Sequence, residues 1–286
     1  MKQLVKRLRD FNELVMFQHS IFSLPFIFIA MIVAADGWFG FKLLFLGALA
    51  AVSARNTAMG FNRYVDRAYD VHNPRTANRP SVDGRLGGAS IAIFTAVNAL
   101  VFMAVTYFVN DLAFAVSVPV LIILLSYSYF KRFSSMAHLV LGISLGLAPM
   151  AGAIAVLGTV PLWSLYLSIG VMFWVAGFDL LYSLQDMEFD QTNNLHSIPS
   201  KYGSRTTLQI SVAFHGLTLL FWGFFVVAAN LAIFGYAALI FSLVMLGYEH
   251  YLVRKDFTKI DRAFFTVNGY LGFVFFGCVI LDKVIP

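Results

Sequence analysis

Residues 55–80 read RNTAMGFNRYVDRAYDVHNPRTANRP, a stretch that begins inside an apolar run and ends in a loop rich in Asn, Asp and Arg. Asn62, Asp66 and Asp70 follow one another at steps of four residues, so a helix would place them on one face. Arg55 precedes Asn62 by seven residues, which puts it two turns back on the same face. Carboxylates stacked in this way repel each other unless a cation lies between them. The stretch therefore predicts a cation site at the end of a helix.

The composition of the chain is that of an integral membrane protein. Of its 286 residues 59% are hydrophobic and 12% are charged, and the mean hydropathy is +0.78. Soluble globular proteins carry about 25% charged residues. The net charge of +5 does not indicate nucleic-acid binding, because the Lys and Arg residues lie between apolar segments and form no basic domain. We expect the lipid bilayer to surround the chain.

Apolar runs long enough to cross a bilayer recur along the whole sequence. A hydrocarbon core of ~30 Å needs about 20 apolar residues per helix. We therefore expect an all-α fold, a multi-pass membrane bundle of nine transmembrane helices, with residues 1–286 forming a single membrane domain. The expected spans are roughly 18–35, 40–62, 89–108, 112–130, 135–156, 162–183, 207–229, 233–252 and 263–281.

Positive charge is divided unevenly between the two sides of these spans. Of the 20 Lys and Arg residues, only Lys42 and Lys283 fall on the side of the short connectors. By the positive-inside rule, the N-terminus and the long loops are then cytoplasmic. An odd number of spans puts the C-terminus outside.

A second polar cluster closes the sixth expected span. Asp179, Tyr182, Asp186 and Asp190 follow at i, i+3, i+7 and i+11, which is a single stripe on a helix. Asp186 lies 120 residues after Asp66, with four spans between them. Both acidic clusters therefore reach the same membrane side, at a spacing that suggests two four-helix repeats plus one helix.

Carboxylates from two helices at one polar mouth suit a divalent cation. Mg²⁺ prefers oxygen ligands in octahedral geometry and often bridges to substrate phosphates, and it neutralises the charge of a departing diphosphate. Arg and Lys in the adjoining loops would bind further phosphate oxygens, and a bundle with 30 Phe residues could house a hydrocarbon chain. A polyprenyl diphosphate combines both parts. The basic candidates are Arg67, Arg75, Arg79, Lys201 and Arg205.

The alternative to an enzyme is a protein of another functional class, namely a secondary transporter that uses buried carboxylates for ion coupling. Transporters place their substrate and ion sites near the bilayer midplane, often at broken helices. Here the acidic and amide groups lie at helix ends, beside loops rich in Arg and Asn. That placement favours an enzyme that acts on an interfacial headgroup.

The two clusters resemble the motifs of the UbiA superfamily of intramembrane prenyltransferases. Residues 62–70, NRYVDRAYD, match its NxxxDxxxD pattern, and residues 73–80, NPRTANRP, match the element that follows. Residues 179–190 carry the Asp-x-x-Tyr and DxxxD patterns of its second motif. The resemblance covers nearly the whole chain. It implies that an allylic cation from a polyprenyl diphosphate alkylates an aromatic acceptor.

The resemblance also implies roles for individual residues. Mg²⁺ and the diphosphate would be carried by Asn62, Asp66, Asp70, Asp186 and Asp190. Arg55 would contact the diphosphate or a carboxylate of the acceptor. The predicted catalytic residues are Asp66, Asp70, Asp179, Asp186 and Asp190, and the predicted substrate-binding residues are Arg55, Asn62, Arg67, Arg75, Arg79, Tyr182 and Lys201.

Within this superfamily the chain is similar to bacterial 4-hydroxybenzoate polyprenyltransferases, which serve respiratory quinone biosynthesis in the inner membrane. Its second motif reads YSLQDMEFD at 182–190 and is followed by LHSIP at 195–199, whereas ubiquinone enzymes tend to carry a Val-Asp-Arg-Asp-Asp-Asp run. The second motif of this chain is similar to that of a subgroup in which some members resemble enzymes of menaquinone biosynthesis. The expected acceptor is 4-hydroxybenzoate, and the alternative is 1,4-dihydroxy-6-naphthoate.

Overall fold

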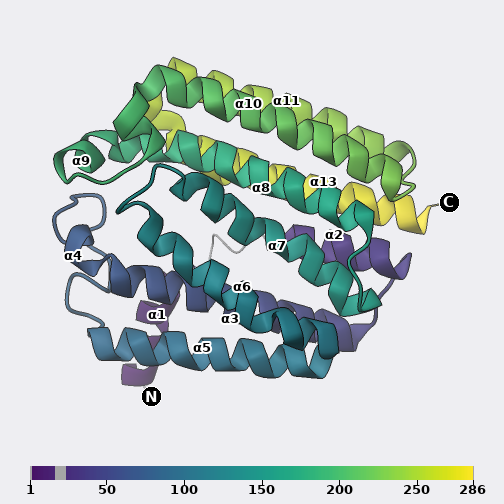
Figure 1. Cartoon of the computed structure of the whole chain (residues 1–286), viewed down its shortest axis with the longest axis horizontal. Helices are drawn as coiled ribbons and strands as arrows, with labels where there is room; N and C mark the ends of the chain where they lie inside the picture. The colour runs from purple at the N-terminus through teal and green to yellow at the C-terminus, as the bar shows by residue number, and fades with distance from the viewer. Residues whose placement is uncertain (1, 17–23, 286) are drawn as a thin grey trace.

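The computed structural model describes residues 2–16 and 24–285, and these residues form a bundle of helices along one long axis (Figure 1). The loops next to α4 and α9 lie at one end of the bundle, and the short connectors and the C-terminus lie at the other (Figure 1). Short 3₁₀ segments occupy Ser183–Asp186 and Phe257–Lys259, and a π-helical segment occupies Ala263–Val267. The α-helices are α1 (Lys2–Leu14), α2 (Leu24–Ala35), α3 (Phe41–Val65), α4 (Arg67–Asp70), α5 (Gly88–Val109), α6 (Asp111–Phe130), α7 (Ala137–Leu157), α8 (Leu162–Tyr182), α9 (Met187–Thr192), α10 (Ile198–Ala228), α11 (Ile233–Lys255), α12 (Ile260–Arg262) and α13 (Asn268–Val284).

Within the described residues, eight helical segments are long and apolar enough to cross a membrane. They match the second to ninth expected spans, although α10 begins at Ile198 and not at 207, because helix continues on both sides of a break at Gly203 (φ 76°). The first expected span, 18–35, is described only from Leu24, since residues 17–23 lie outside the described part. Its visible helix, α2, has 12 residues and a length of about 18 Å, which is short of a bilayer core. The first expected span, the total of nine and the two four-helix repeats stay predictions.

Helix α2 is buried in the bundle. Its Phe26 is fully buried and lies 5.0 Å from the ring of Trp174 on α8 and 5.4 Å from the ring of Trp222 on α10 (centroid distances). Phe275 of α13 completes this aromatic core at 6.0 Å. Since lipid is as apolar as these rings, close van der Waals packing holds the helices together here.

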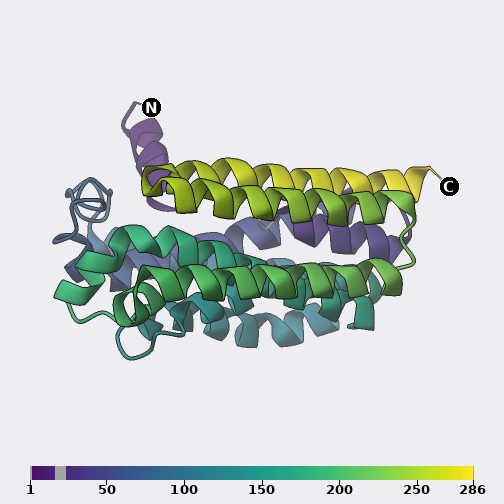
Figure 2. The same cartoon turned by 90° about the horizontal axis from the view of Figure 1, so that it is seen from above.

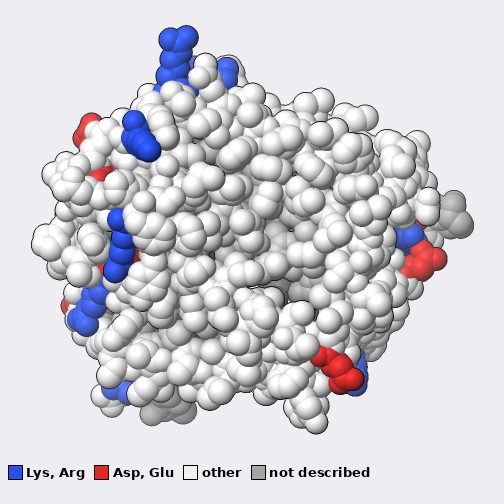
Figure 3. Space-filling view, in the orientation of Figure 1, with Lys and Arg blue, Asp and Glu red and all other residues white. Residues whose placement is uncertain are grey.

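The outer surface of the bundle suits a bilayer. Charged side chains gather near the two ends of the face seen in Figure 3, and its centre is almost free of them. Large apolar side chains such as Phe41, Phe45 and Ile233 are exposed on the long helices. Figure 2 shows α11 and α13 side by side along the bundle, with α1 crossing at the loop end. The chain is an integral membrane protein.

Helices α7 and α8 approach each other unusually closely. A Cβ atom added at Gly142 would lie 2.3 Å from the backbone oxygen of Met172, and one at Gly146 would lie 2.8 Å from that of Ser168. Small residues four apart allow membrane helices to touch in this way. His138 lies one turn before Gly142 on the same face of α7, so the contact brings it against α8.

Candidate active site

In each motif the helix breaks at the first carboxylate of the DxxxD pattern. Helix α3 ends at Val65, and Asp66 (φ −86°, ψ 0°) separates it from α4. In the second motif Asp186 (φ −98°, ψ 2°) lies between the 3₁₀ turn and α9. The expectation of one continuous helical stripe per motif is therefore wrong. Both aspartates adopt the sparsely populated bridge conformation, which redirects the chain beyond them.

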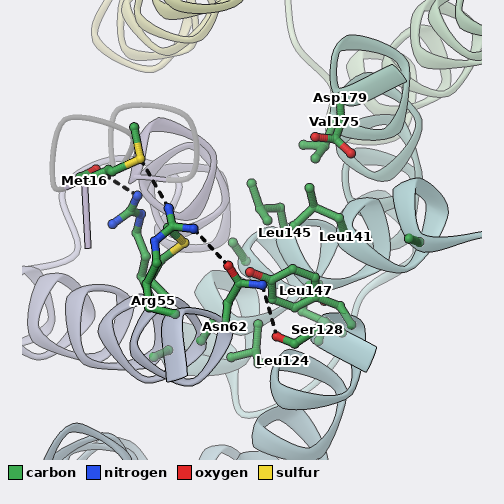
Figure 4. A pocket seen from close by; sticks show the side chains of 18 of the residues that line it. Met16, Arg55, Asn62, Leu124, Ser128, Leu141, Leu145, Leu147, Val175 and Asp179 are labelled. Carbon is green, nitrogen blue, oxygen red and sulfur yellow. Dashed lines mark hydrogen bonds between the residues drawn. The ribbon is translucent and has the colours of Figure 1, made fainter. Parts of the chain in front are cut away.

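A cavity of about 420 Å³ lies between the two motifs, with walls from α3, α5, α6, α7 and α8. One end is polar and lies beside the loops. The other end runs between the helices and is lined by apolar side chains such as Leu141, Leu145 and Val175 (Figure 4). The predicted site residues that line this cavity are Arg55, Asn62, Asp66, Asp70, Arg75, Arg79, Asp179, Tyr182, Asp186 and Asp190.

Three basic residues expected to bind the substrate lie outside this cavity. Arg67 is exposed and borders a separate surface pocket with Tyr64. Lys201 is exposed in the first turn of α10, with its Nζ 5.2 Å from the ring centroid of Tyr202, and Arg205 is exposed one turn further on. Their roles stay predictions that their positions do not support.

The loop after α4 connects the two motifs directly. Arg75 donates from Nε to Asp186 Oδ1 at 2.9 Å and from Nη2 to Asp186 Oδ2 at 2.5 Å. Asn73 donates to the same carboxylate at 3.2 Å. Arg79 donates from Nη1 to both oxygens of Asp70 at 2.8 Å. Burial lowers the pKa of Arg75, but the adjacent Asp186 carboxylate outweighs this effect and raises it, so this guanidinium stays charged.

The other carboxylates of the motifs are less completely paired. Asp66 accepts a hydrogen bond from Asn62 at 2.7 Å and lies 3.6 Å from Arg132 Nη2. Burial and the charge of Asp70 together raise the pKa of Asp66. Asp190 is 2% exposed, and its Oδ2 has no hydrogen-bond partner among the described residues. An oxygen in this state is available to a cation.

Lys131 and Arg132 also line the cavity, although the motifs do not include them. Burial lowers the pKa of Lys131, but the carboxylates of both motifs, with Asp190 and Asp186 foremost, outweigh it and raise the pKa. In the sequence this pair reads as a topology signal. Its position at the membrane side that bears both motifs is the available clue to a role in the site.

Two arginines on α3 bring positive charge without carboxylate partners among the described residues. Arg55 donates from Nη1 to the carbonyl of Val15 at 2.8 Å and from Nη2 to the carbonyl of Met16 at 3.0 Å (Figure 4). Arg63, which sequence reasoning missed, is buried and donates to Asn62 Oδ1 at 3.2 Å. A structural ion pair of Arg55 with Asp179, the alternative to a substrate contact, does not form, because Asp179 pairs with His138. Both guanidiniums can therefore attract an anion into the cavity.

A model of the UbiA prenyltransferase family matches residues 23–277. The chain belongs to this family. It is accordingly a prenyltransferase, and the match includes both motifs and the helices that surround the cavity. The UbiA resemblance inferred from residues 62–80 and 179–190 is confirmed.

Relatives of the chain carry more detailed names. The 4-hydroxybenzoate octaprenyltransferase of Janthinobacterium sp. (strain Marseille) is 29% identical over 90% of each chain. The protein of that name from Albidiferax ferrireducens is 31% identical over 86% of this chain and 83% of its own. The apo structure of a UbiA homolog from Aeropyrum pernix K1 is 29% identical, with a TM-score of 0.85 over 93% of this chain and 98% of that one. A UbiA homolog from Archaeoglobus fulgidus bound to DMAPP and Mg²⁺ has 16% identity and a TM-score of 0.79 over 97% and 100% of the chains, and so supports the fold.

The oxygen donors of this UbiA-family site suit Mg²⁺ by their chemistry. Aspartate and asparagine oxygens from both motifs line one cavity, and the unpaired Asp190 oxygen is buried. Among the described residues, however, no three acidic, His or Cys side chains lie close enough together to hold a metal. Arg75 and Arg79 occupy the carboxylates of Asp186 and Asp70 instead. A cation that approached Asp186 or Asp70 would compete with these guanidiniums.

Proposed function

We propose that this chain transfers a polyprenyl group from a polyprenyl diphosphate to 4-hydroxybenzoate, with Mg²⁺, in respiratory quinone biosynthesis. The observation that carries the proposal is the cavity, in which both carboxylate motifs and an apolar channel meet. The names of the relatives support the acceptor, and the neighbours bound to DMAPP or GPP with Mg²⁺ support the donor and the metal.

The polar end of the cavity would hold the diphosphate. Asn62, Asp66, Asp70, Asp186 and Asp190 would hold Mg²⁺, which supplies neutralisation of the charge that develops on the leaving diphosphate. The guanidiniums that now pair with two of these carboxylates would turn to the diphosphate oxygens, which accept the same forked hydrogen bonds. The predicted loop cations that would do so are Arg75 and Arg79.

The apolar end would hold the isoprenoid chain. Its Leu and Val side chains exclude water, which would otherwise capture an allylic cation before the acceptor does. Arg55 and Arg63, which lack carboxylate partners in the described chain, would hold the carboxylate of the aromatic acceptor. The acceptor ring would then lie between the diphosphate end and Asp179.

A direct assay tests the reaction and the acceptor together. The purified membrane protein is incubated with octaprenyl diphosphate and Mg²⁺, with 4-hydroxybenzoate and 1,4-dihydroxy-6-naphthoate in competition, and the products are identified by mass. We expect prenylated 4-hydroxybenzoate. A product formed only from the naphthoate would reassign the acceptor and leave the reaction class intact.

Variants test the site itself. Asp66→Ala and Asp186→Ala are expected to abolish Mg²⁺-dependent transfer while the protein remains folded, because each removes a carboxylate from one side of the cavity. Glu188→Ala is the matched control, since Glu188 is an exposed acidic residue of the same segment and does not line the cavity. Wild-type transfer rates in both aspartate variants would overturn the assignment.

We also propose that residues 1–286 act as one membrane domain in the bacterial cytoplasmic membrane, with the N-terminus and the motif loops cytoplasmic and the C-terminus outside. The support is the distribution of charge, because Lys42 and Lys283 are the exceptions at the short-connector end. In a variant that carries Cys278→Ser to remove the native free thiol, a membrane-impermeant thiol reagent applied to intact cells should label Ser134→Cys only after lysis. Labelling before lysis would reverse the orientation.

A further inference from the structure

His138 and Asp179 form a pair that lies outside both DxxxD patterns. His138 is fully buried at the start of α7, and its Nδ1 lies 2.7 Å from Asp179 Oδ2 on α8. Because a carboxylate accepts hydrogen bonds, Nδ1 carries the hydrogen and donates it to Asp179. The close α7–α8 contact at Gly142 and Gly146 fixes the distance between the two side chains.

Asp179 differs from the neighbouring carboxylates in its partners. Asp70 and Asp186 are each held by an arginine, whereas in the described chain the only side chain that hydrogen-bonds to the carboxylate of Asp179 is His138. Its second oxygen, Oδ1, makes no hydrogen bond among the described residues. Figure 4 shows Asp179 facing the cavity beside Leu141 and Leu145, at some distance from Asn62. It lies seven residues before Asp186, about 10 Å deeper along the helix axis.

The second nitrogen of His138 indicates that packing alone does not explain this pair. Nε2 is buried and has no hydrogen-bond partner among the described residues. An unpaired buried nitrogen destabilises the fold, and an apolar side chain of similar size would avoid that loss. The hydrogen bond from Nδ1 to Asp179 is the polar contact that His138 makes.

We propose that His138 is a positioning residue, which holds Asp179 with Oδ1 directed at the acceptor so that Asp179 takes the proton that the acceptor loses. This inference rests on the proposed prenyl transfer. The carbon–oxygen bond of the allylic diphosphate breaks, and its electron pair leaves with the diphosphate. A π pair of the acceptor ring then forms the new carbon–carbon bond. The proton on that ring carbon passes to Asp179 Oδ1, and the electron pair of the carbon–hydrogen bond restores the aromatic ring.

The location of Asp179 fits this step. A base that removes a ring proton must lie near the ring and outside the metal cluster, because a carboxylate that binds Mg²⁺ is a poorer proton acceptor. Asp179 is the cavity carboxylate that belongs to neither DxxxD pattern. A donor on Oδ2 fixes the rotamer of the carboxylate and leaves Oδ1 free, which is the arrangement a general base needs.

Four variants separate this role from a structural one. His138→Leu removes the donor, and His138→Gln keeps an N–H that can reach Asp179. Asp179→Asn keeps the shape of the side chain but cannot take a proton. Ser211→Ala is the matched control, since Ser211 is fully buried, donates at 2.8 Å to the carbonyl of Gly177 on α8 and does not line the cavity.

The test measures prenylation at saturating acceptor with normal 4-hydroxybenzoate and with 4-hydroxybenzoate deuterated at both ring carbons beside the hydroxyl. We expect His138→Leu to lower the rate about tenfold to a hundredfold, as the loss of a hydrogen bond to a charged group predicts. Deprotonation then becomes slower than bond formation, so His138→Leu should show a larger deuterium isotope effect than the wild type. His138→Gln should recover most of the rate, Asp179→Asn should lose it, and Ser211→Ala should match the wild type.

The increase in Tm that Mg²⁺ plus octaprenyl diphosphate cause in the absence of acceptor distinguishes a failure of this inference from a failure of the proposed function. We expect it to be unchanged in both His138 variants and in Ser211→Ala. A wild-type rate and isotope effect in His138→Leu, or a wild-type rate in Asp179→Asn, would overturn the inference while the proposed function stands. Absence of product from the wild type would instead overturn the proposed function, and this inference with it. If His138→Leu does not fold, Asp179→Asn and His138→Gln decide the question.

Discussion

Replacing Arg75 by Ala tests whether its guanidinium and Mg²⁺ compete for the carboxylate of Asp186. Arg75 forms a forked pair with Asp186 and also donates to the hydroxyl of Tyr182 at 3.0 Å. If Asp186 is a Mg²⁺ ligand, the metal must displace Arg75 to reach it. Arg75→Ala should therefore make the metal-free protein less stable and should also increase the stabilisation that Mg²⁺ alone provides.

The size of the first effect follows from burial. Breaking a buried ion pair costs ~3–5 kcal/mol. The Asp186 side chain is 9% exposed but that of Arg75 is 32% exposed, so solvent screening reduces the expected loss to about 2 kcal/mol. In a protein of this size, 1 kcal/mol corresponds to a Tm change of about 2–4 °C. The metal-free variant should melt roughly 4–8 °C below the wild type.

Thermal unfolding in detergent micelles provides the measurement, first with EDTA and then with Mg²⁺. Arg85→Ala is the control, because Arg85 pairs with Glu13 and Asp83 at 2.7 Å outside the cavity. It should lower Tm with EDTA but leave the Mg²⁺-dependent increase at its wild-type value. An unchanged Tm for Arg75→Ala with EDTA, or a smaller increase with Mg²⁺ than in the wild type, would refute the reasoning.

Three further outcomes follow from other parts of the molecule. Lys131→Met should weaken the binding of octaprenyl diphosphate at least about tenfold, because the substitution removes a cation that lies among the cavity carboxylates. An unchanged dissociation constant in a titration would contradict this prediction. The hydrogen bond from Arg85 lowers the pKa of Glu13 below the ordinary value for Glu of about 4.3, so the ionised Glu13 stabilises the docking of α1 above that ordinary value. This stability is lost as the pH falls through the lowered pKa, and the rate of hydrogen exchange in α1 should rise in that pH range. In Arg85→Ala the exchange rate in α1 should already be high at pH 7. Gly142→Ala should cost about 1–3 kcal/mol because its Cβ would meet an α8 carbonyl at 2.3 Å, whereas Gly216→Ala, with open space around it, should melt like the wild type.

The transmembrane segments were predictable because their signal is local. Length and apolar content define each span, and the eight described spans lie within a few residues of the expected ones except at α10. The common membrane side of the two motifs was also predictable, since it needs only the number of spans between them. The helix breaks were not. Neither Asp66 nor Asp186 is next to Pro or Gly, so no residue in the sequence marks the change in backbone conformation.

The composition of the site depends on where loops and helix ends fold back. Arg75 contacts Asp186 across 111 residues of sequence, and no periodicity carries that information. Lys131 and Arg63 line the cavity because helix ends converge there, whereas Arg67, which adjoins Asp66 in the first motif, borders a different pocket. A motif therefore identifies the carboxylates better than it identifies their cationic partners.

The balance of charge in the cavity leads to a last prediction about how the substrates bind. Among the described residues, six cationic side chains and five aspartates line the cavity. The cations are Arg55, Arg63, Arg75, Arg79, Lys131 and Arg132, and the aspartates are Asp66, Asp70, Asp179, Asp186 and Asp190. The cavity thus carries one net positive charge when all are ionised. Mg²⁺ alone would add to it, but a triply charged prenyl diphosphate together with one Mg²⁺ carries a single negative charge and would balance it. Mg²⁺ and octaprenyl diphosphate should therefore each bind more tightly in the presence of the other, by the same factor. Calorimetric titration of Mg²⁺ into the protein with and without octaprenyl diphosphate measures that factor, and equal affinities in the two titrations would mean that the ions and side chains counted here do not share one site.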